Sequence, residues 1–193
     1  MRLFLAPFAA LVLAGCLSLG GAEPPPSLLT LTPQATAPAG SGSTGTGAEA
    51  LTVVEPDAPA RLAVTRVPVQ VDDANVAYLQ DAVWVERPAR LFRRLLSETI
   101  AAKTGRIVID GIDPTIKTTQ RLRGRLLDFG YDARTSAVVV RFDAIRDGAD
   151  GSVTTRRFES VVPGVAAEAG PVGEALNRAA NDVAGQVADW MAE

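Results

Sequence analysis

The stretch that decides the fold runs from Tyr78 to Leu96 and reads YLQDAVWVERPARLFRRLL. Its apolar residues 82–85 predict a short strand. Pro88 then suits the first position of a helix. After it, apolar residues recur at helical spacing, namely Leu91, Phe92, Leu95, Leu96, Thr99 and Ile100. Gly105 ends the pattern, so the sequence predicts a strand followed directly by an amphipathic helix.

Beyond this helix the sequence predicts a brief strand, a meander of three longer strands, and a closing helix. The strands are expected at residues 106–109, 121–130, 137–146 and 152–161. Short polar turns separate the last three, which is typical of antiparallel neighbours. From about residue 171 to the terminus one helical face is apolar, with Val172, Leu176, Ala179, Val183, Val187, Trp190 and Met191.

Upstream of the deciding stretch, residues 61–71 alternate imperfectly and are interrupted by Pro68. They predict an edge strand, or a strand that ends near the proline. The polar residues 72–75 form a turn before the next strand. Taken together, the pattern predicts an α/β (α+β) fold with a single mainly antiparallel sheet and two main helices packed on one face.

The N-terminus has the features of a signal peptide at residues 1–15. Arg2 precedes an uncharged apolar run at residues 3–13, which is shorter than the roughly 20 residues that span a bilayer. The residues LAGC that end at Cys16 resemble the bacterial lipobox, which implies cleavage between Gly15 and Cys16 and a lipid on the Cys16 thiol. Cys16 is the only cysteine, so it forms no disulfide within the chain. The alternative is an ordinary secretory signal followed by a chance cysteine.

Residues 16–60 are rich in Pro, Gly, Ser, Thr and Ala, and residues 39–47 read AGSGSTGTG. Such composition predicts a flexible tether. The apolar residues near 27–32 predict a short strand within it. We therefore expect the folded domain to cover residues 61–193.

Composition excludes several classes of function. The chain contains no histidine, which removes the commonest general base and metal ligand. It also lacks a Gly-rich phosphate loop. We expect no enzyme activity, no catalytic residue, no metal and no cofactor. All but one of the 19 basic residues and all but four of the 22 acidic ones lie in residues 61–193. That region is nearly neutral, so we expect no nucleic-acid partner.

The stretch from Tyr78 to Leu96 resembles the ABC-type transport auxiliary lipoprotein family, as do the lipobox, Val67-Pro68, the three-strand meander and the closing helix. The resemblance implies a partner of an envelope ABC permease and ATPase that handles lipids with an MCE-domain substrate-binding protein. It also implies attachment to a membrane through the N-terminal lipid. Leu17 stands where an inner-membrane retention signal would place Asp, so similarity to sorted lipoproteins favours the outer membrane, facing the periplasm. Assembly into a homo-oligomer is left as an open alternative.

Four residues of this stretch are candidates for binding a partner. Tyr78 and Trp84 are aromatic, and aromatic residues are enriched at interface hot spots. Arg87 and Arg90 would meet an acidic partner or lipid headgroups. The alternatives are a core role for Trp84 and a solvated helix face for the arginines. A further candidate is a basic surface made by Arg121, Arg123, Arg125 and Arg156.

Two other functions compete with a transport role. An envelope-remodelling enzyme would need carboxylates such as Glu86, Asp110 or Asp113 to converge in a cleft. A periplasmic lipid-binding shuttle would need an apolar pocket of several hundred Å³ between the sheet and the helices, roughly the size of other small-molecule sites.

Overall fold

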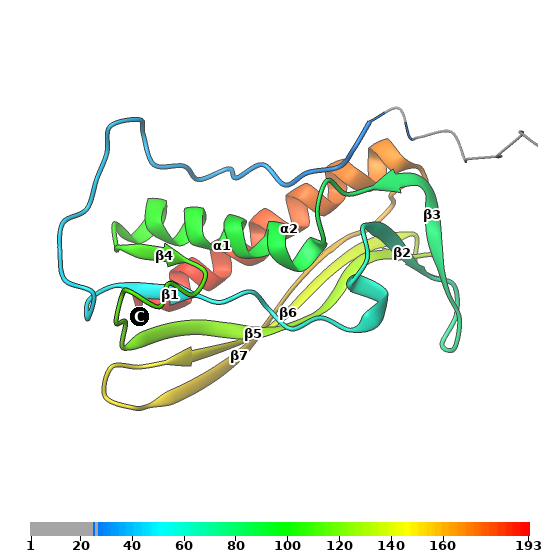
Figure 1. The fold of residues 1–193 in the computed structure, drawn as a ribbon. Coiled ribbons are helices and arrows are strands. Elements are labelled where there is room, and N and C mark those ends of the chain that lie inside the picture. The colour runs from blue at the N-terminus through cyan, green and yellow to red at the C-terminus, as the bar shows by residue number, and fades with distance from the viewer. Residues whose placement is uncertain (1–24, 26) are drawn as a thin grey trace, which may run out of the picture.

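The computed structural model describes residue 25 and residues 27–193, which form a twisted sheet with two helices on one of its faces (Figure 1). The elements in chain order are β1 (Leu51–Val53), the 3-10 helix η1 (Ala60–Leu62), β2 (Arg66–Gln70), β3 (Val76–Val83), α1 (Pro88–Thr104), β4 (Val108–Asp110), β5 (Gln120–Asp132), β6 (Ala137–Asp147), β7 (Val153–Val162) and α2 (Ala169–Ala192).

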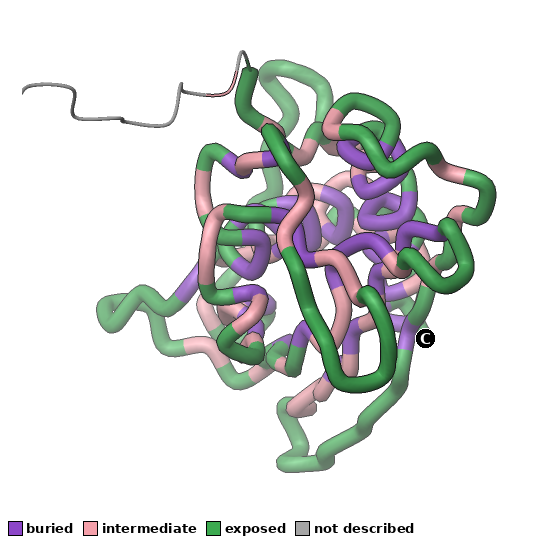
Figure 2. The backbone as a smooth tube through the Cα atoms, turned by 90° about the vertical axis from the view of Figure 1, so that its right-hand side faces the viewer, coloured by how far each residue is buried: buried purple, intermediate pink, exposed green. Residues whose placement is uncertain are grey.

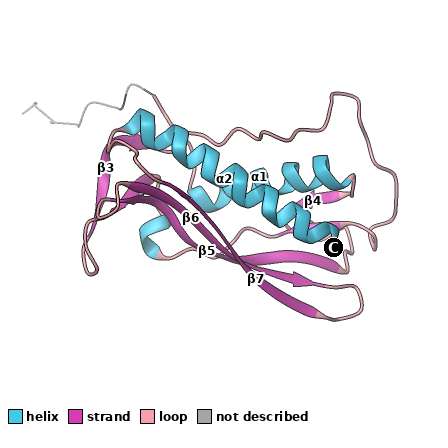
Figure 3. Ribbon diagram, turned by 180° about the vertical axis from the view of Figure 1, so that it is seen from behind, coloured by secondary structure: helices cyan, strands magenta, loops and turns pink. Residues whose placement is uncertain are grey.

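The two helices form where the apolar spacing predicted them. Pro88 is the first residue of α1, and Gly105 ends it in a left-handed conformation with φ of 68°. Glycine adopts this conformation without steric cost. The helices α1 and α2 contact one another, and α2 also lies against β6 and β7. Figure 3 shows both helices on the same side of the sheet, which confirms the predicted fold class.

The sheet is mainly antiparallel, as expected, but it is mixed rather than purely antiparallel. Strand β5 pairs antiparallel with β6 along its whole length, and β6 pairs antiparallel with β7. The other edge of β5 is shared by β1 and β2, both parallel to it, and β4 extends the sheet beyond β1. The sequence pattern missed this arrangement because parallel pairing joins β5 to short segments far away in the chain.

Of the two alternatives predicted around Pro68, the edge strand is wrong, whereas the strand does end near the proline, at Gln70. Strand β2 lies between β3 and β5. The β2–β3 register shifts between Arg66 and Pro68, so the missing N–H of the proline falls where the ladder is already irregular. Gly130 of β5 passes so close to Pro68 that a side chain there would collide with the proline carbonyl. Because Gly130 has no side chain, the neighbouring strand leaves room for the proline within the sheet.

Residues 27–60 also differ from the expected tether. Leu51 and Val53 of β1 are fully buried within the sheet. The strand expected near 27–32 is a single bridge, in which Leu29 pairs with Trp84. The chain thus first contacts the folded domain at Leu29 rather than at residue 61, although residues 36–46 are exposed. The predicted signal peptide at residues 1–15 lies outside the described residues.

Aromatic side chains fill the space between the sheet and the helices. The Phe92 ring of α1 contacts the ring of Phe142 on β6 with 5.4 Å between ring centroids. Phe129 of β5 packs edge-on against Trp84 at 5.5 Å. All four residues are buried, and Figure 2 shows buried backbone gathered at the centre of the molecule. The described part of the chain therefore has a packed core where the shuttle hypothesis needs an apolar pocket.

Candidate functional site

The outer face of β5, β6 and β7, opposite the helices, carries a ladder of arginine–carboxylate pairs. Arg123 on β5 binds Asp147 on β6 at 2.8 Å. Arg157 on β7 binds Asp143 on β6 at 2.6 Å, and this hydrogen bond lowers the pKa of the Asp143 carboxyl. Side chains alternate between the two faces of a strand, so these pairs lie opposite the apolar core. The outer face is charged, and its charges largely neutralise one another.

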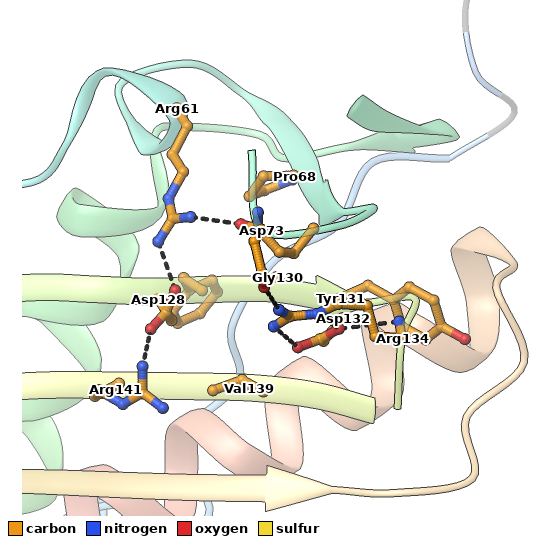
Figure 4. Close-up of a pocket in the computed structure, with 12 residues that line it drawn as sticks. Arg61, Pro68, Asp73, Asp128, Gly130, Tyr131, Asp132, Arg134, Val139 and Arg141 are labelled. Atoms are coloured by element: carbon orange, nitrogen blue, oxygen red, sulfur yellow. Dashed lines mark hydrogen bonds and ion pairs between the residues drawn. The ribbon is translucent and has the colours of Figure 1, made fainter. Parts of the chain in front are cut away.

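A hollow of about 310 Å³ opens on this face where β2 passes β5 (Figure 4). Gly130 and Pro68 line it at the close approach described above. Asp128 lies between two cations, Arg61 at 2.5 Å and Arg141 of β6. Arg61 also donates a hydrogen bond to the carbonyl of residue 127. These contacts fix η1, which carries Arg61, to the outer face of the sheet.

The other side of the hollow is built around Arg134. Its guanidinium binds Asp132 at 2.6 Å and Asp73 of the β2–β3 turn at 2.5 Å. The hydrogen bond from Arg134 lowers the pKa of Asp132, and the same contact raises the pKa of Arg134. Each charged group that lines the hollow already has an oppositely charged partner among the described residues. The arrangement therefore suits holding the strands together better than binding a free ion.

The carboxylates considered for catalysis have separate partners and do not contact one another. Glu86 forms ion pairs with two arginines of α1. Asp110 binds Arg93 at 3.1 Å, and Asp113 accepts hydrogen bonds from Thr115. Hydrogen bonds from an arginine and from Thr115 lower the pKa of Glu86 and of Asp113 respectively. A general acid at neutral pH needs a raised pKa, so these residues lack the arrangement that the enzyme hypothesis requires.

The four residues proposed to bind a partner are placed differently from one another. Trp84 is 1% exposed and belongs to the core, so it is not available on the surface. Tyr78 is half-buried on β3, with an arginine guanidinium 3.9 Å from its ring centroid. Arg87 and Arg90 are exposed at the start of α1, where each forms an ion pair. The lipidation and cleavage residues, Gly15 and Cys16, lie outside the described residues.

Of the four arginines expected to form a basic surface, Arg121, Arg123 and Arg125 share the outer face of β5, but Arg156 does not join them. Arg123 is neutralised by its ion pair on the outer face. Arg156 lies on the helix side of the sheet, where it contacts the Trp190 ring and binds Glu193 at 3.2 Å. The reason is strand alternation, because Arg156 has the parity of the buried Phe158 rather than that of the outward-facing residues.

A strap over the helices was not foreseen from the sequence. Residues 29–37 run along the outside of the helical layer, as the blue segment of Figure 1 shows. The Thr32 amide donates to Asn177 Oδ1 at 2.9 Å, and the Gln34 amide donates to Asn181 Oδ1 at 2.8 Å. The buried Asn181 returns a hydrogen bond from Nδ2 to the Thr32 carbonyl at 3.0 Å. The only sequence signal for this strap would have been Asn177 and Asn181, two polar residues on the face of α2 that packs inward.

Two further features were sought over the part of the chain that the structure describes. It contains no group of three or more Cys, Asp or Glu side chains placed to hold a metal ion. None of its helices combines the length and the apolar character needed to cross a membrane.

Comparison with solved structures relates the fold to known proteins. A crystal structure of an uncharacterized protein shares 14% identity, covers 86% of this chain and 99% of its own, and gives a TM-score of 0.65. A protein from Xanthomonas campestris shares 16% identity over 86% of this chain and 94% of its own, with a TM-score of 0.69. These similarities establish a shared fold.

A PelC dodecamer from Paraburkholderia phytofirmans is more distant. It shares 11% identity over 75% of this chain and 92% of its own, and its TM-score of 0.40 is too low to carry an argument about assembly. No curated protein sequence matches the chain significantly. A family model described as the ABC-type transport auxiliary lipoprotein component matches residues 29–188. That match begins at the Leu29 bridge and covers all seven strands, α1 and most of α2, so the chain belongs to the ABC-type transport auxiliary lipoprotein family.

Proposed function

We propose that this protein is the membrane-anchored auxiliary lipoprotein of an envelope ABC transport system that moves lipids between the inner and outer membranes. Its partners would be a permease, an ATPase and an MCE-domain substrate-binding protein. The observation that carries the proposal is the family match over residues 29–188, because it identifies an auxiliary transport component. The family is one of transport components rather than enzymes.

The lipobox supports the anchoring part of the proposal. Cys16 is the single cysteine of the chain and follows a signal-like segment. A lone thiol in an oxidising compartment is reactive, and acylation would remove that reactivity. We propose that the lipid at Cys16 holds the domain at the outer membrane, facing the periplasm.

The interior of the domain supports a docking role over a carrier role. Trp84, Phe92 and Leu96 are at most 1% exposed and fill the layer between the helices and the sheet. A carrier with its own lipid cavity would need that space. We infer that the domain contributes to a lipid path through its surface and its partners.

Affinity capture tests this function. The native lipoprotein would be purified from solubilised envelopes, with Cys16→Ser as the control, and co-purified proteins and lipids would be identified by mass spectrometry. We expect an MCE-domain protein with its permease and ATPase, and we expect the control to lose them. Recovery of a glycan or peptidoglycan ligand without any ABC component would contradict the proposal.

A further inference from the structure

The strap fixes the point at which the chain leaves the folded domain. The Leu29 amide donates to the Val83 carbonyl at 2.7 Å, and the Val85 amide donates to the Leu29 carbonyl at 2.9 Å. Farther along, Asn177 and Asn181 hold the strap on α2. Any anchor attached before Leu28 is therefore connected to the end of the domain that carries Leu29. The expected tether would instead have joined the domain at residue 60.

This fixed point limits how far the domain can move from an anchor at Cys16. Twelve residues separate Cys16 from Leu28 (28 − 16). Such a chain spans at most about 43 Å when fully extended. A tether that continued to residue 60, which is 44 residues from Cys16, would reach roughly 160 Å at full extension.

The opposite end of the domain lies at a distance from Leu29 that is close to this maximum span. Leu29 contacts Gly173 near the start of α2, and Arg146 of β6 hydrogen-bonds the Trp190 carbonyl near its end. Seventeen helical residues cover about 26 Å, and the three residues from Arg146 to the turn at Ala149 add up to about 10 Å. A domain that stood on the turn at Ala149, with Leu28 uppermost, would need a nearly fully extended tether.

The surface around the exit point has the composition of a lipid-facing surface. Trp84 points into the core, so its neighbours Val83 and Val85 point to the outer face. Leu28 lies beside Val83 on one side, because Leu29 pairs with Trp84. Arg66 of β2 is paired with Val83 on the other side. Leu28 is 52% exposed and Val85 is 46% exposed.

An unpaired cation completes this surface. Arg66 is exposed, and its guanidinium lies 3.9 Å from the centroid of the Tyr78 ring. Within the described residues it forms no ion pair with a carboxylate, in contrast to Arg61, Arg123 and Arg157. We name Leu28, Arg66, Tyr78, Val83 and Val85 the tether-exit patch. Aromatic and basic residues beside apolar ones are typical of the membrane–water interface.

We propose that the tether-exit patch lies against the surface of the bilayer that holds the anchor, with Arg66 facing the headgroup phosphates. This inference rests on the proposed anchoring at Cys16. It orients the domain, because the turn at Ala149, beside the C-terminal end of α2, then projects away from the membrane. A partner from the other membrane would meet this far end first.

Fluorescence quenching in vesicles tests the orientation. The acylated full-length protein would be reconstituted in vesicles of phosphatidylethanolamine and phosphatidylglycerol that contain nitroxide-headgroup lipids. Acylated Cys16 cannot react with a thiol probe, so Val85→Cys or Ala149→Cys provides a single labelling site. We expect several-fold stronger quenching at residue 85 than at residue 149. Equal quenching, or stronger quenching at residue 149, would overturn the inference.

A charge-reversal pair tests the patch itself. Arg66→Glu should reduce quenching at residue 85 several-fold. Arg121→Glu makes the same charge change at an exposed arginine near the far end and should leave quenching unchanged. Unchanged quenching in Arg66→Glu, with its circular dichroism intact, would refute contact through the patch. Failure of the anchor would look different, because the protein would not remain on the vesicles and its N-terminal peptide would lack the acyl mass.

Discussion

Replacing Asn181 with alanine should loosen the strap on α2, where Asn177 would still hold the Thr32 amide. Asn181 makes two hydrogen bonds to the strap, accepting from the Gln34 amide at 2.8 Å and donating to the Thr32 carbonyl at 3.0 Å. Each such bond contributes about 0.5–1.5 kcal/mol net, so the variant should lose about 1–3 kcal/mol of unfolding free energy. Asp182→Ala is the matched control, because Asp182 is exposed on the same helix and does not bond the strap. Both changes gain similar helix propensity.

Urea denaturation measures the stability difference, and amide hydrogen exchange locates it. The Gln34 amide loses its acceptor in Asn181→Ala, so it should exchange faster by roughly a factor of ten for each 1.4 kcal/mol lost locally. The exchange rates of amides in the centre of β5 should change only in proportion to the change in global stability. The reasoning would be refuted if Asn181→Ala matched Asp182→Ala in stability and kept the Gln34 amide protected.

Three further changes have expected outcomes. Gly130→Ala should destabilise the domain by about 1–3 kcal/mol in urea denaturation, because its methyl group would press on the Pro68 carbonyl; wild-type stability would contradict the close approach. Trp84→Ala should lower the free energy of unfolding by about 3–5 kcal/mol, as expected for a buried core residue. Unaltered stability would contradict a core role for Trp84. Arg134 lowers the pKa of Asp132, so their contact stabilises the fold above the unfolded pKa of Asp, about 3.9. This stability is lost as the pH falls through the lower folded pKa. Arg134→Gln should therefore be less stable than the wild type at pH 7 and equally stable in acid. A stability difference that stays constant across the pH range would contradict the pairing.

The elements with strong local signals could be predicted from the sequence. Helix α1 combines Pro88, Gly105 and an apolar stripe, and the meander of β5, β6 and β7 has short turns that join neighbours. These features depend on residues close together in the chain. Local propensity and periodicity are sufficient to define them.

Features that depend on distant residues were missed. β1 is only three residues long and lies in a polar, glycine-rich context, so its identity as a strand comes from parallel pairing with β4 and β5. The strap depends on Asn181, which is 149 residues from Thr32. Among the candidate site residues, Trp84 was proposed to bind a partner, and its burial favours the alternative of a core role. Arg66, the unpaired cation of the tether-exit patch, could not be identified as a site residue from the sequence. Only the sheet places it beside Tyr78 and Val83.

Mass spectrometry of the N-terminal peptide, from native protein in separated inner and outer membranes, tests most directly that this family member is a lipid-anchored envelope component. The account predicts a mature chain that begins at Cys16, carries the mass of two or three acyl chains and is recovered in the outer-membrane fraction. A chain with an unmodified Cys16, or one cleaved at another residue and recovered free of membranes, would contradict it.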